Sequence, residues 1–436
     1  MKAKLFIGPM SKNVVDAIID YANNNNAEIG IIPSRRQIEK DGGYVNNWTT
    51  KDFCEYVKSK SNKILLVRDH CGPLQGNFED DGIESFKEDC KYFDVVHIDV
   101  WKKHKNYLDG LNATIDFIMM GFAENPNLYY EIGTEEAIRP FSSEELENLI
   151  NDLKIKLPSN VYKNIKYVVI QSGTALKGNK NIGNYDNSRL IKMLEVAKKH
   201  SLISKEHNGD YIHDNILSNK FICGLNGINI APEFGQLETK IILEEIGDNQ
   251  DLLEKFYQIC YESKRWVKWV SHDFNPFQKK IELINICGHY VFSNPEFIQI
   301  KKLLNINVDS KIKNKIIERI DRFMQNLKID KKEILISYFE MFSNKDIQGL
   351  TDIFDENITL VDWENSSNGK DDVIKANQNI FNNVNTIKVD VINIFEKEDE
   401  FSCQILITIN GNDILEVVDV IKFKDNKIIS VKAYKG

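Results

Sequence analysis

The feature that most constrains this chain is a regular alternation, over the first 230 residues, of short β-branched apolar runs with longer segments of helical periodicity. Strands that alternate with helices form a parallel sheet, because each helix returns the chain to the same end of the sheet. Eight strands with connections of this length favour a closed (β/α)8 TIM barrel. An open doubly wound sheet is the alternative, but no strand is followed by the Gly-x-Gly-x-x-Gly fingerprint. We expect strands at residues 5–8, 29–32, 63–67, 95–98, 128–132, 166–170, 202–205 and either 221–224 or 227–230.

Apolar residues at helical spacing predict the helices between these strands. We expect Thr50 and Ser142 to cap two of them, because a hydroxyl oxygen can accept a hydrogen bond from the first helical turn. Residues 234–328 contain no convincing strand, which predicts a last barrel helix followed by an all-helical extension. The expected barrel helices lie at 14–21, 50–57, 83–93, 113–122, 144–153 and 189–197, and those of the following segment at 237–246, 252–261 and 312–327.

The pattern changes near Lys331, where helices give way to long alternating strands. Helices followed by an antiparallel meander predict a separate α+β domain. We therefore place the barrel at residues 1–250, the helical extension at 251–328 and the α+β domain at 329–436. The expected elements of this domain are helices at 332–342, 346–353 and 370–382 and strands at 358–361, 387–395, 400–409, 413–422 and 427–433.

Composition limits the partners of this 436-residue chain. Its formal net charge of −9 argues against a general nucleic-acid surface. No apolar run approaches the roughly 18–20 residues that span a bilayer, and the apolar part of the N-terminus is too short for a signal peptide. The seven cysteines are odd in number and form no CxxC pair. This pattern disfavours zinc fingers and a disulfide framework, and it predicts a cytoplasmic protein.

Polar residues gather after the predicted strands, which is where a parallel barrel places its chemistry. Three of the eight histidines and at least four carboxylates fall at these ends, so a functional site on this rim is expected. The candidates are Ser34 and Arg35 after the second strand, Asp69 and His70 after the third, His97 and Asp99 at the fourth, Glu131 and Glu135 at the fifth, Gln171 after the sixth, His207 and Asp210 after the seventh, and Asn229 at the eighth.

Histidine and glutamate at successive strand ends are the materials of a divalent metal site. Zinc accepts imidazole and carboxylate ligands, and a catalytic zinc keeps three protein ligands and one open position. We prefer His70, Glu131 and His207 as ligands, with His97 in reserve. Asp69 would point away from His70 if both lay on a regular strand. In a loop just beyond the strand, it can face the same cavity and move a proton.

Other rim residues indicate a phosphate site. Gly173-Thr174 and Asn229 follow the sixth and eighth strands, close to where barrels bind phosphate through backbone N–H groups. A plain tight turn explains Gly173-Thr174 equally well. Lys177 offers positive charge for the same phosphate.

These residues carry a resemblance to the class II tagatose-bisphosphate aldolase group, especially its non-catalytic subunit, over about residues 1–250. The similar stretches include Gly42-Gly43-Tyr44, Asp69-His70-Cys71-Gly72-Pro73, Ile132-Gly133-Thr134-Glu135 and Asn208-Gly209-Asp210-Tyr211. The chain also looks like the catalytic aldolases at Gly173-Thr174-Ala175, His207 and Asn229. The resemblance implies that Asp69 is the proton donor and acceptor and that His70 and His207 bind zinc.

One departure stands out. Where the catalytic family continues Gly-Thr-Ala with its second zinc histidine, this chain has Leu176-Lys177-Gly178. Either Glu131 or His97 completes a different metal site, or the barrel does something else. Two functions therefore compete: a zinc-dependent lyase that cleaves a ketose phosphate, and an accessory subunit that stabilises a catalytic aldolase partner.

The order of elements after residue 331 resembles the cone-shaped fold of nuclear transport factor 2 and of polyketide-cyclase-like proteins. The matching stretches include Phe342-Ser343-Asn344-Lys345-Asp346 and Gly369-Lys370-Asp371-Asp372-Val373. A cone of this kind holds an internal pocket, and the polar residues expected near it are Asp362, Trp363, Glu364, Asp419 and Tyr434. Because no clear acid–base pair is present, we expect this domain to bind a ligand or to dimerise the chain into a homo-oligomer.

Overall fold

The chain forms two compact units in a computed structural model that describes residues 3–327, 330–424 and 426–436. The first unit contains residues 3–216 and 225–327, and the second contains residues 217–224 and the C-terminal residues from 330. The domain boundary expected at residues 328–329 lies outside the described residues. The alternating pattern and the meander pattern of the sequence thus belong to different units.

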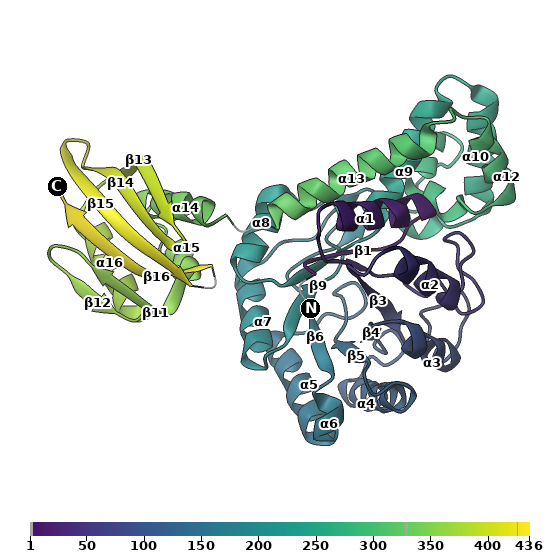
Figure 1. Cartoon of the computed structure of the whole chain (residues 1–436), viewed down its shortest axis with the longest axis horizontal. Coiled ribbons are helices and arrows are strands. Elements are labelled where there is room, and N and C mark those ends of the chain that lie inside the picture. The colour runs from purple at the N-terminus through teal and green to yellow at the C-terminus, as the bar shows by residue number, and fades with distance from the viewer. Residues whose placement is uncertain (1–2, 328–329, 425) are drawn as a thin grey trace. The chain divides into compact units, whose positions relative to one another are not determined.

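Eight parallel strands close the first unit into a barrel, in the order β1-β10-β9-β6-β5-β4-β3-β2 (Figure 1). The predicted (β/α)8 fold is confirmed. Of the two candidates for the last strand, only the second is a strand: β10 pairs with both β1 and β9, whereas residues 221–222 end helix α8 (Asp214–Ile222). The strands are β1 (Leu5–Ile7), β2 (Ile29–Ile31), β3 (Ile64–Cys71), β4 (Val95–Ile98), β5 (Tyr129–Ile132), β6 (Ile165–Ile170), β9 (Ile203–Glu206) and β10 (Gly227–Ile230).

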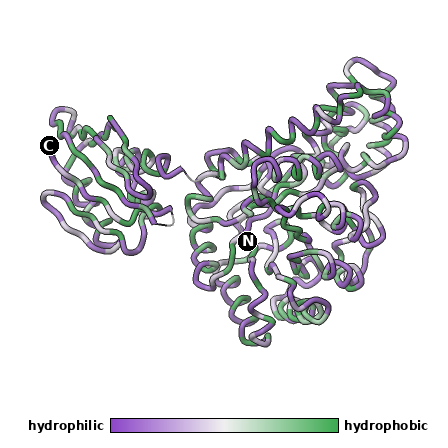
Figure 2. The backbone as a smooth tube through the Cα atoms, viewed as in Figure 1, coloured by the Kyte–Doolittle hydropathy of each residue, from purple (hydrophilic) through white to green (hydrophobic). Residues whose placement is uncertain are grey.

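The outer helices bury one apolar face each, and Figure 2 shows hydrophobic and hydrophilic stretches alternating along them. Ser142 caps α5 as predicted, since its hydroxyl accepts from the Glu145 N–H. At α2 the prediction of Thr50 was wrong: Thr49 is the cap, whereas Thr50 is buried and its hydroxyl bonds other side chains. The other barrel helices are α1 (Lys12–Asn24), α3 (Ile83–Tyr92), α4 (Tyr107–Glu124), α6 (Ser159–Tyr162) and α7 (Asn187–Lys199), with α2 at Thr50–Lys60 and α5 at Ser143–Lys156.

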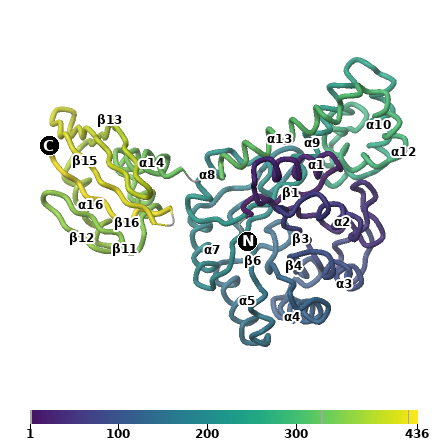
Figure 3. The backbone as a smooth tube through the Cα atoms, viewed as in Figure 1, coloured from purple at the N-terminus to yellow at the C-terminus, as the bar shows by residue number. Residues whose placement is uncertain are grey.

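The described residues after β10 and up to 327 form helices joined by turns and loops, with no strand, as predicted. Its last helix packs along α1 from the start of the chain, and Figure 3 shows the two side by side. The extension is therefore part of the barrel unit. Its elements are α9 (Pro232–Ile246), α10 (Gln250–Glu262), η1 (Val267–Trp269), α11 (Lys280–Cys287), η2 (Gly288–Val291), α12 (Pro295–Lys302) and α13 (Val308–Asn326).

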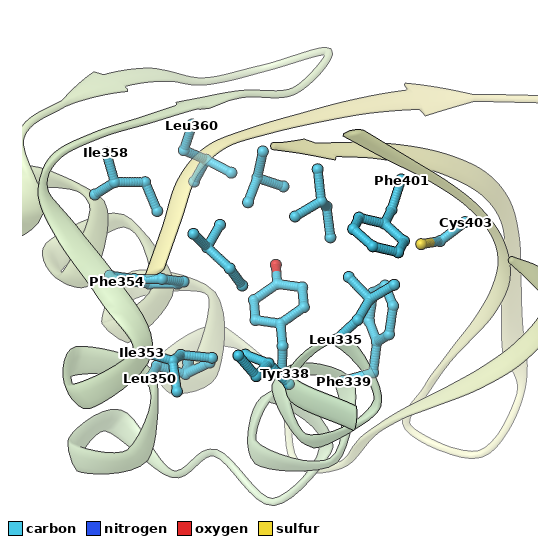
Figure 4. Close-up of a cluster of buried hydrophobic side chains, with 14 of the residues drawn as sticks. Leu335, Tyr338, Phe339, Leu350, Ile353, Phe354, Ile358, Leu360, Phe401 and Cys403 are labelled. Carbon is cyan, nitrogen blue, oxygen red and sulfur yellow. The ribbon is translucent and has the colours of Figure 1, made fainter. Parts of the chain in front are cut away.

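The C-terminal unit packs three helices against a six-stranded sheet in the order β12-β11-β16-β15-β14-β13. Its core includes Tyr338 and Phe339 of α14 and Phe401 and Cys403 of β14, which Figure 4 shows within one cluster. The three-residue strand β12 was not predicted, because Ser-Ser-Asn carries no apolar signal. The elements are α14 (Lys331–Ser343), α15 (Ile347–Ile353), β11 (Phe354–Val361), β12 (Ser366–Asn368), α16 (Lys370–Asn383), β13 (Ile387–Lys397), β14 (Glu400–Ile409), β15 (Asp413–Lys424) and β16 (Lys427–Lys435).

None of the described helices combines the length and the apolar character needed to cross a lipid bilayer.

Candidate metal centre and substrate cavity

A cavity of about 310 Å³ opens at the carboxyl ends of the barrel strands. Segments that follow all eight strands contribute to its wall, as expected for a parallel barrel. Seven of the predicted site residues line it, namely Ser34, Asp69, His70, Glu135, His207, Asp210 and Asn229.

An irregularity in β3 turns both Asp69 and His70 into this cavity. The pairing of β3 with β4 shifts register between Arg68 and Cys71, and His70 has a φ of 47°. A bulge of this kind breaks the alternation of side chains along a strand. The strand therefore continues to Cys71, four residues beyond the predicted end, without placing Asp69 and His70 on opposite faces. A left-handed backbone at a histidine is strained, and such strain is frequent at functional sites.

Three histidines surround the Asp69 carboxylate. His70 Nε2 lies 3.4 Å from Asp69 Oδ2, while His97 Nδ1 and His207 Nδ1 lie 3.4 and 3.7 Å from Asp69 Oδ1. Every pair of these histidines belongs to a group whose ligand atoms lie within 4.8 Å of one another. His70 and His207 line the cavity, and His97 is fully buried.

The second nitrogen of each imidazole has a separate partner. His70 Nδ1 lies 2.6 Å from Asp99 Oδ2, and His97 Nε2 lies 3.1 Å from the Gly133 carbonyl oxygen. His207 Nε2 lies 3.0 Å from Glu131 Oε1. Because each of these partners is an acceptor, the imidazole N–H donates to it and the remaining nitrogen faces Asp69. Metal-binding histidines are oriented in the same way, by a carboxylate or carbonyl behind the ring.

Glu131 is held by Lys205 and His207 rather than being free. Its Oε2 lies 2.5 Å from Lys205 Nζ, and both residues are fully buried. Burial alone would raise the pKa of Glu131, but Lys205, His97 and His207 lower it to about 2. Both carboxylate oxygens are thus occupied, one by Lys205 and the other by His207.

The charges at the centre stabilise one another. Burial raises the pKa of Asp69, but His70, His97 and His207 bring it far below its ordinary range. Burial lowers the pKa of His70, but Asp69, Asp99 and Glu135 raise it to about 10. Without a metal, His70 therefore carries a proton at neutral pH, and a metal that bound there would have to displace it.

Other predicted residues have structural partners and do not line the cavity. Arg35 is buried in ion pairs with Asp80 and Glu39. Gln171 donates to the Thr134 and Arg139 carbonyls, and Thr174 donates to the His207 carbonyl. Gly173 has a φ of 92° in a tight approach to Asn184, as the plain-turn interpretation predicts. Lys177 is exposed on the short hairpin of β7 (Leu176–Lys177) and β8 (Lys180–Asn181).

Asp210 and Asn229 differ although both line the cavity. Asp210 accepts from the backbone N–H groups of Ala231 and Glu233 at the start of α9. Those amides are therefore already bonded and do not offer a free phosphate site. Asn229 is 7% exposed, and neither polar atom of its side chain has a hydrogen-bond partner within the described chain. A buried amide without partners indicates a place for a ligand.

Sequence reasoning missed several residues of the cavity. Arg36 lines it in place of its neighbour Arg35, and Lys102 follows β4. Tyr44, Trp269 and Tyr290 form an aromatic part of the wall, and Lys268 lies beside them. No local pattern singles out Lys268, Trp269 or Tyr290, because these residues lie on the helical extension, far from the barrel strands in the sequence.

The C-terminal unit has its own cavity of about 320 Å³. Asp362, Trp363, Glu364 and Asp419 line it as expected, whereas Tyr434 is 58% exposed outside it. Most of the remaining wall is apolar, including Phe339, Leu360, Ile405 and Val417. Burial, followed by the charge of Asp362, raises the pKa of Asp419 to about 7.

Solved structures with likeness to this chain were found for each of the two units. A probable tagatose 6-phosphate kinase from Sinorhizobium meliloti 1021 is 16% identical with a TM-score of 0.58, over 87% of this chain and 98% of that one. The YdjI aldolase from Escherichia coli K12 is 11% identical with a TM-score of 0.48, over 76% and 94%. An NTF2-like protein of unknown function from Cytophaga hutchinsonii is 14% identical with a TM-score of 0.23, over 25% and 92%.

Residues 335–431 match the family of SnoaL-like domains, which confirms the expected class of the C-terminal unit. No curated protein sequence matches the chain. At these identities, the likeness to the first structure establishes a shared barrel fold and leaves the reaction to be argued from the site.

Proposed function

We propose that the barrel is a metal-dependent lyase of the class II aldolase kind, which reversibly cleaves a carbon–carbon bond in a ketose phosphate. The observation that carries this proposal is the set of three imidazoles around Asp69, each supported from behind by a buried acceptor. Three neutral imidazole nitrogens suit zinc or another divalent transition metal. We assign His70, His97 and His207 as the ligands, and Glu131 as the residue that orients His207.

A bound divalent metal would polarise the substrate carbonyl as a Lewis acid. The residues of the chain supply the rest. Asp69, ionised at neutral pH, accepts the proton of the substrate hydroxyl as the adjacent carbon–carbon bond breaks, and the electron pair of that bond moves toward the carbonyl. The free amide of Asn229 is available to bind a substrate oxygen. Glu135 accepts from Asn208 at 2.7 Å and lies 3.7 Å from His70 Nε2, so its charge stabilises the protonated form of His70 when no metal is bound.

Metal content and turnover test this proposal together. We expect close to one equivalent of divalent metal in protein purified without chelator, and release of a triose phosphate from one or more ketose phosphates. His97→Ala should lose the metal, and Glu131→Gln should bind it about 10–100-fold more weakly. The exposed His272→Ala is the matched control and should change neither. A wild-type protein that takes up no divalent metal after incubation with excess Zn²⁺ would contradict the proposal.

Leu176 favours a second candidate. This apolar side chain lines the cavity at the position where the resemblance leads one to expect a metal-binding histidine. The chain would then be an accessory subunit of a catalytic aldolase. If the purified protein cleaves no ketose phosphate but raises the activity or yield of a co-expressed catalytic aldolase, this second function is correct.

We further propose that the C-terminal unit pairs two copies of the chain. The face of its sheet that is turned away from the core exposes large apolar residues, among them Phe395, Ile414, Val418 and Tyr434. Val418 and Tyr434 are direct partners on neighbouring strands, so they form a continuous surface. Exposed apolar patches on a sheet mark interaction sites. Val418→Asp should convert a dimer to a monomer in sedimentation measurements, whereas a monomeric wild-type protein would refute the pairing.

A further inference from the structure

Three cations from separate parts of the barrel unit line the same cavity as the histidines. Arg36 follows β2, Lys102 follows β4, and Lys268 lies on η1 of the helical extension. Among the described residues, no carboxylate oxygen lies within ion-pair distance, 4.0 Å, of any of the three. We call these residues the cation cluster.

Each member of the cluster keeps hydrogen-bonding capacity for a ligand. Arg36 Nε donates to the Gly76 carbonyl at 3.1 Å, which anchors the guanidinium and leaves its two terminal nitrogens without an acceptor among the described residues. Lys102 Nζ donates to the Leu74 carbonyl. Lys268 Nζ lies 4.5 Å from the centre of the Trp269 ring and 5.7 Å from that of Tyr290, with no oxygen acceptor in the described chain.

The three cations line one cavity, and they repel one another there. Partial removal from water, followed by Arg36, Arg265 and Lys102, lowers the pKa of Lys268 to about 8. Removal from water, followed by Arg36, also lowers the pKa of Lys102. Like charges that repel in a cavity are stabilised when an anion enters between them. The chain as a whole has a net charge of −9, so this local excess of positive charge runs against its composition.

We propose that the cation cluster is a phosphate-binding subsite that holds an anionic group of the substrate away from its reacting carbons. An arginine fork and two ammonium groups match the several oxygens of a phosphate monoester better than one carboxylate. The backbone N–H groups of Ala231 and Glu233 at the start of α9 are already bonded to Asp210. The cation cluster instead offers three side-chain cations to the cavity. The substrate class is then a sugar phosphate whose phosphate reaches Lys268 of the extension. That the rest of the substrate is a sugar depends on the proposed lyase function.

Binding of inorganic phosphate to the full-length protein tests the subsite without any need for turnover. We expect saturable binding by calorimetry at low ionic strength, weakened about tenfold or more in Lys268→Gln and in Arg36→Gln. Lys264→Gln is the matched control: this exposed lysine lies on the same extension over the Tyr261 ring, outside the cavity, and should leave the affinity unchanged.

The outcomes separate this inference from the proposed function. His70→Ala should lose metal yet still bind phosphate, so phosphate binding that survives in a metal-free, inactive protein supports the subsite alone. Because Lys268 is exposed, Lys268→Gln is expected to fold even if Arg36→Gln does not, and thermal unfolding checks this. Absence of phosphate binding by the wild type up to about 10 mM, or equal affinity in Lys268→Gln and wild type, would overturn the proposal.

Discussion

The two cavities of this chain are nearly equal in volume and opposite in chemistry. The barrel cavity holds Asp69 among three histidines, which bring the pKa of that carboxyl far below its usual range. The C-terminal cavity holds Asp419 between apolar walls and near a second carboxylate, which raise the pKa of Asp419 to about 7. Both aspartates are enclosed, so burial alone raises the pKa of each. The difference shows that the neighbours of a buried carboxyl decide whether it serves as an ionised base or stays protonated.

The largest effect is expected from Asp69→Asn. Loss of the proton acceptor should lower kcat about 10²–10⁴-fold while metal remains bound, because all three imidazoles keep their supporting partners. Steady-state kinetics with parallel elemental analysis measure both. Asp419→Asn is the control in the other cavity and should leave kcat unchanged. Equal loss of activity in the two variants would mean that the two cavities are not chemically independent.

The second largest effect concerns the buried pair between Glu131 and Lys205. Glu131→Gln leaves the Lys205 ammonium uncompensated inside the barrel and should lower the free energy of unfolding of that unit by about 3–5 kcal/mol. Urea unfolding measures the change. The double change Glu131→Leu with Lys205→Met removes both charges and should cost less than the single change. A single variant as stable as the wild type would show that water reaches this pair.

A smaller and pH-dependent effect is expected in the C-terminal cavity. The folded state raises the pKa of Asp419 from about 3.8 to about 7, so it binds a proton that the unfolded chain has released. Stability of this unit should therefore fall as the pH rises from about 4 to about 7, and remain low above that. Asp419→Asn should remove this loss and stabilise the unit at pH 8 by on the order of 2 kcal/mol.

The measurement is thermal unfolding of the full-length protein at pH 5 and pH 8. At pH 5 the wild type and Asp419→Asn should differ little, since Asp419 is protonated in the folded state. If the variant gains no stability at pH 8, water or a counter-charge already stabilises the ionised carboxylate.

The smallest effects are expected from changes to one helix cap in each unit. Ser142 caps α5 of the barrel and Asp346 caps α15 of the C-terminal unit, each by accepting a backbone N–H. Ser142→Ala and Asp346→Ala should each lower stability by about 1 kcal/mol. In calorimetry, each change should shift a different unfolding transition. A shift of one common transition by both variants would show that the units unfold together.

Local patterns in the sequence determined the fold class of both units and the side chains available at the strand ends. Alternation of apolar runs and helical segments predicted the barrel, and the long alternating strands predicted the second unit, with β14 at its predicted bounds. The rule that strand ends carry the chemistry predicted that His70, His97, His207 and Asp69 lie on one rim, and the structure brings them together. These predictions succeed because periodicity is a property of neighbours in the chain.

Contacts between distant segments decided the rest. The bulge that turns Asp69 and His70 into one cavity depends on the register between β3 and β4, and the pairing of Glu131 with Lys205 joins β5 to β9. Those contacts favour His97 over Glu131 as the third metal ligand. Lys268 reaches the cavity from the extension, more than 160 residues after Lys102. The sequence sets which side chains are available at each strand end, but burial, charge pairing and hydrogen bonding between elements far apart in the chain decide which of them meet.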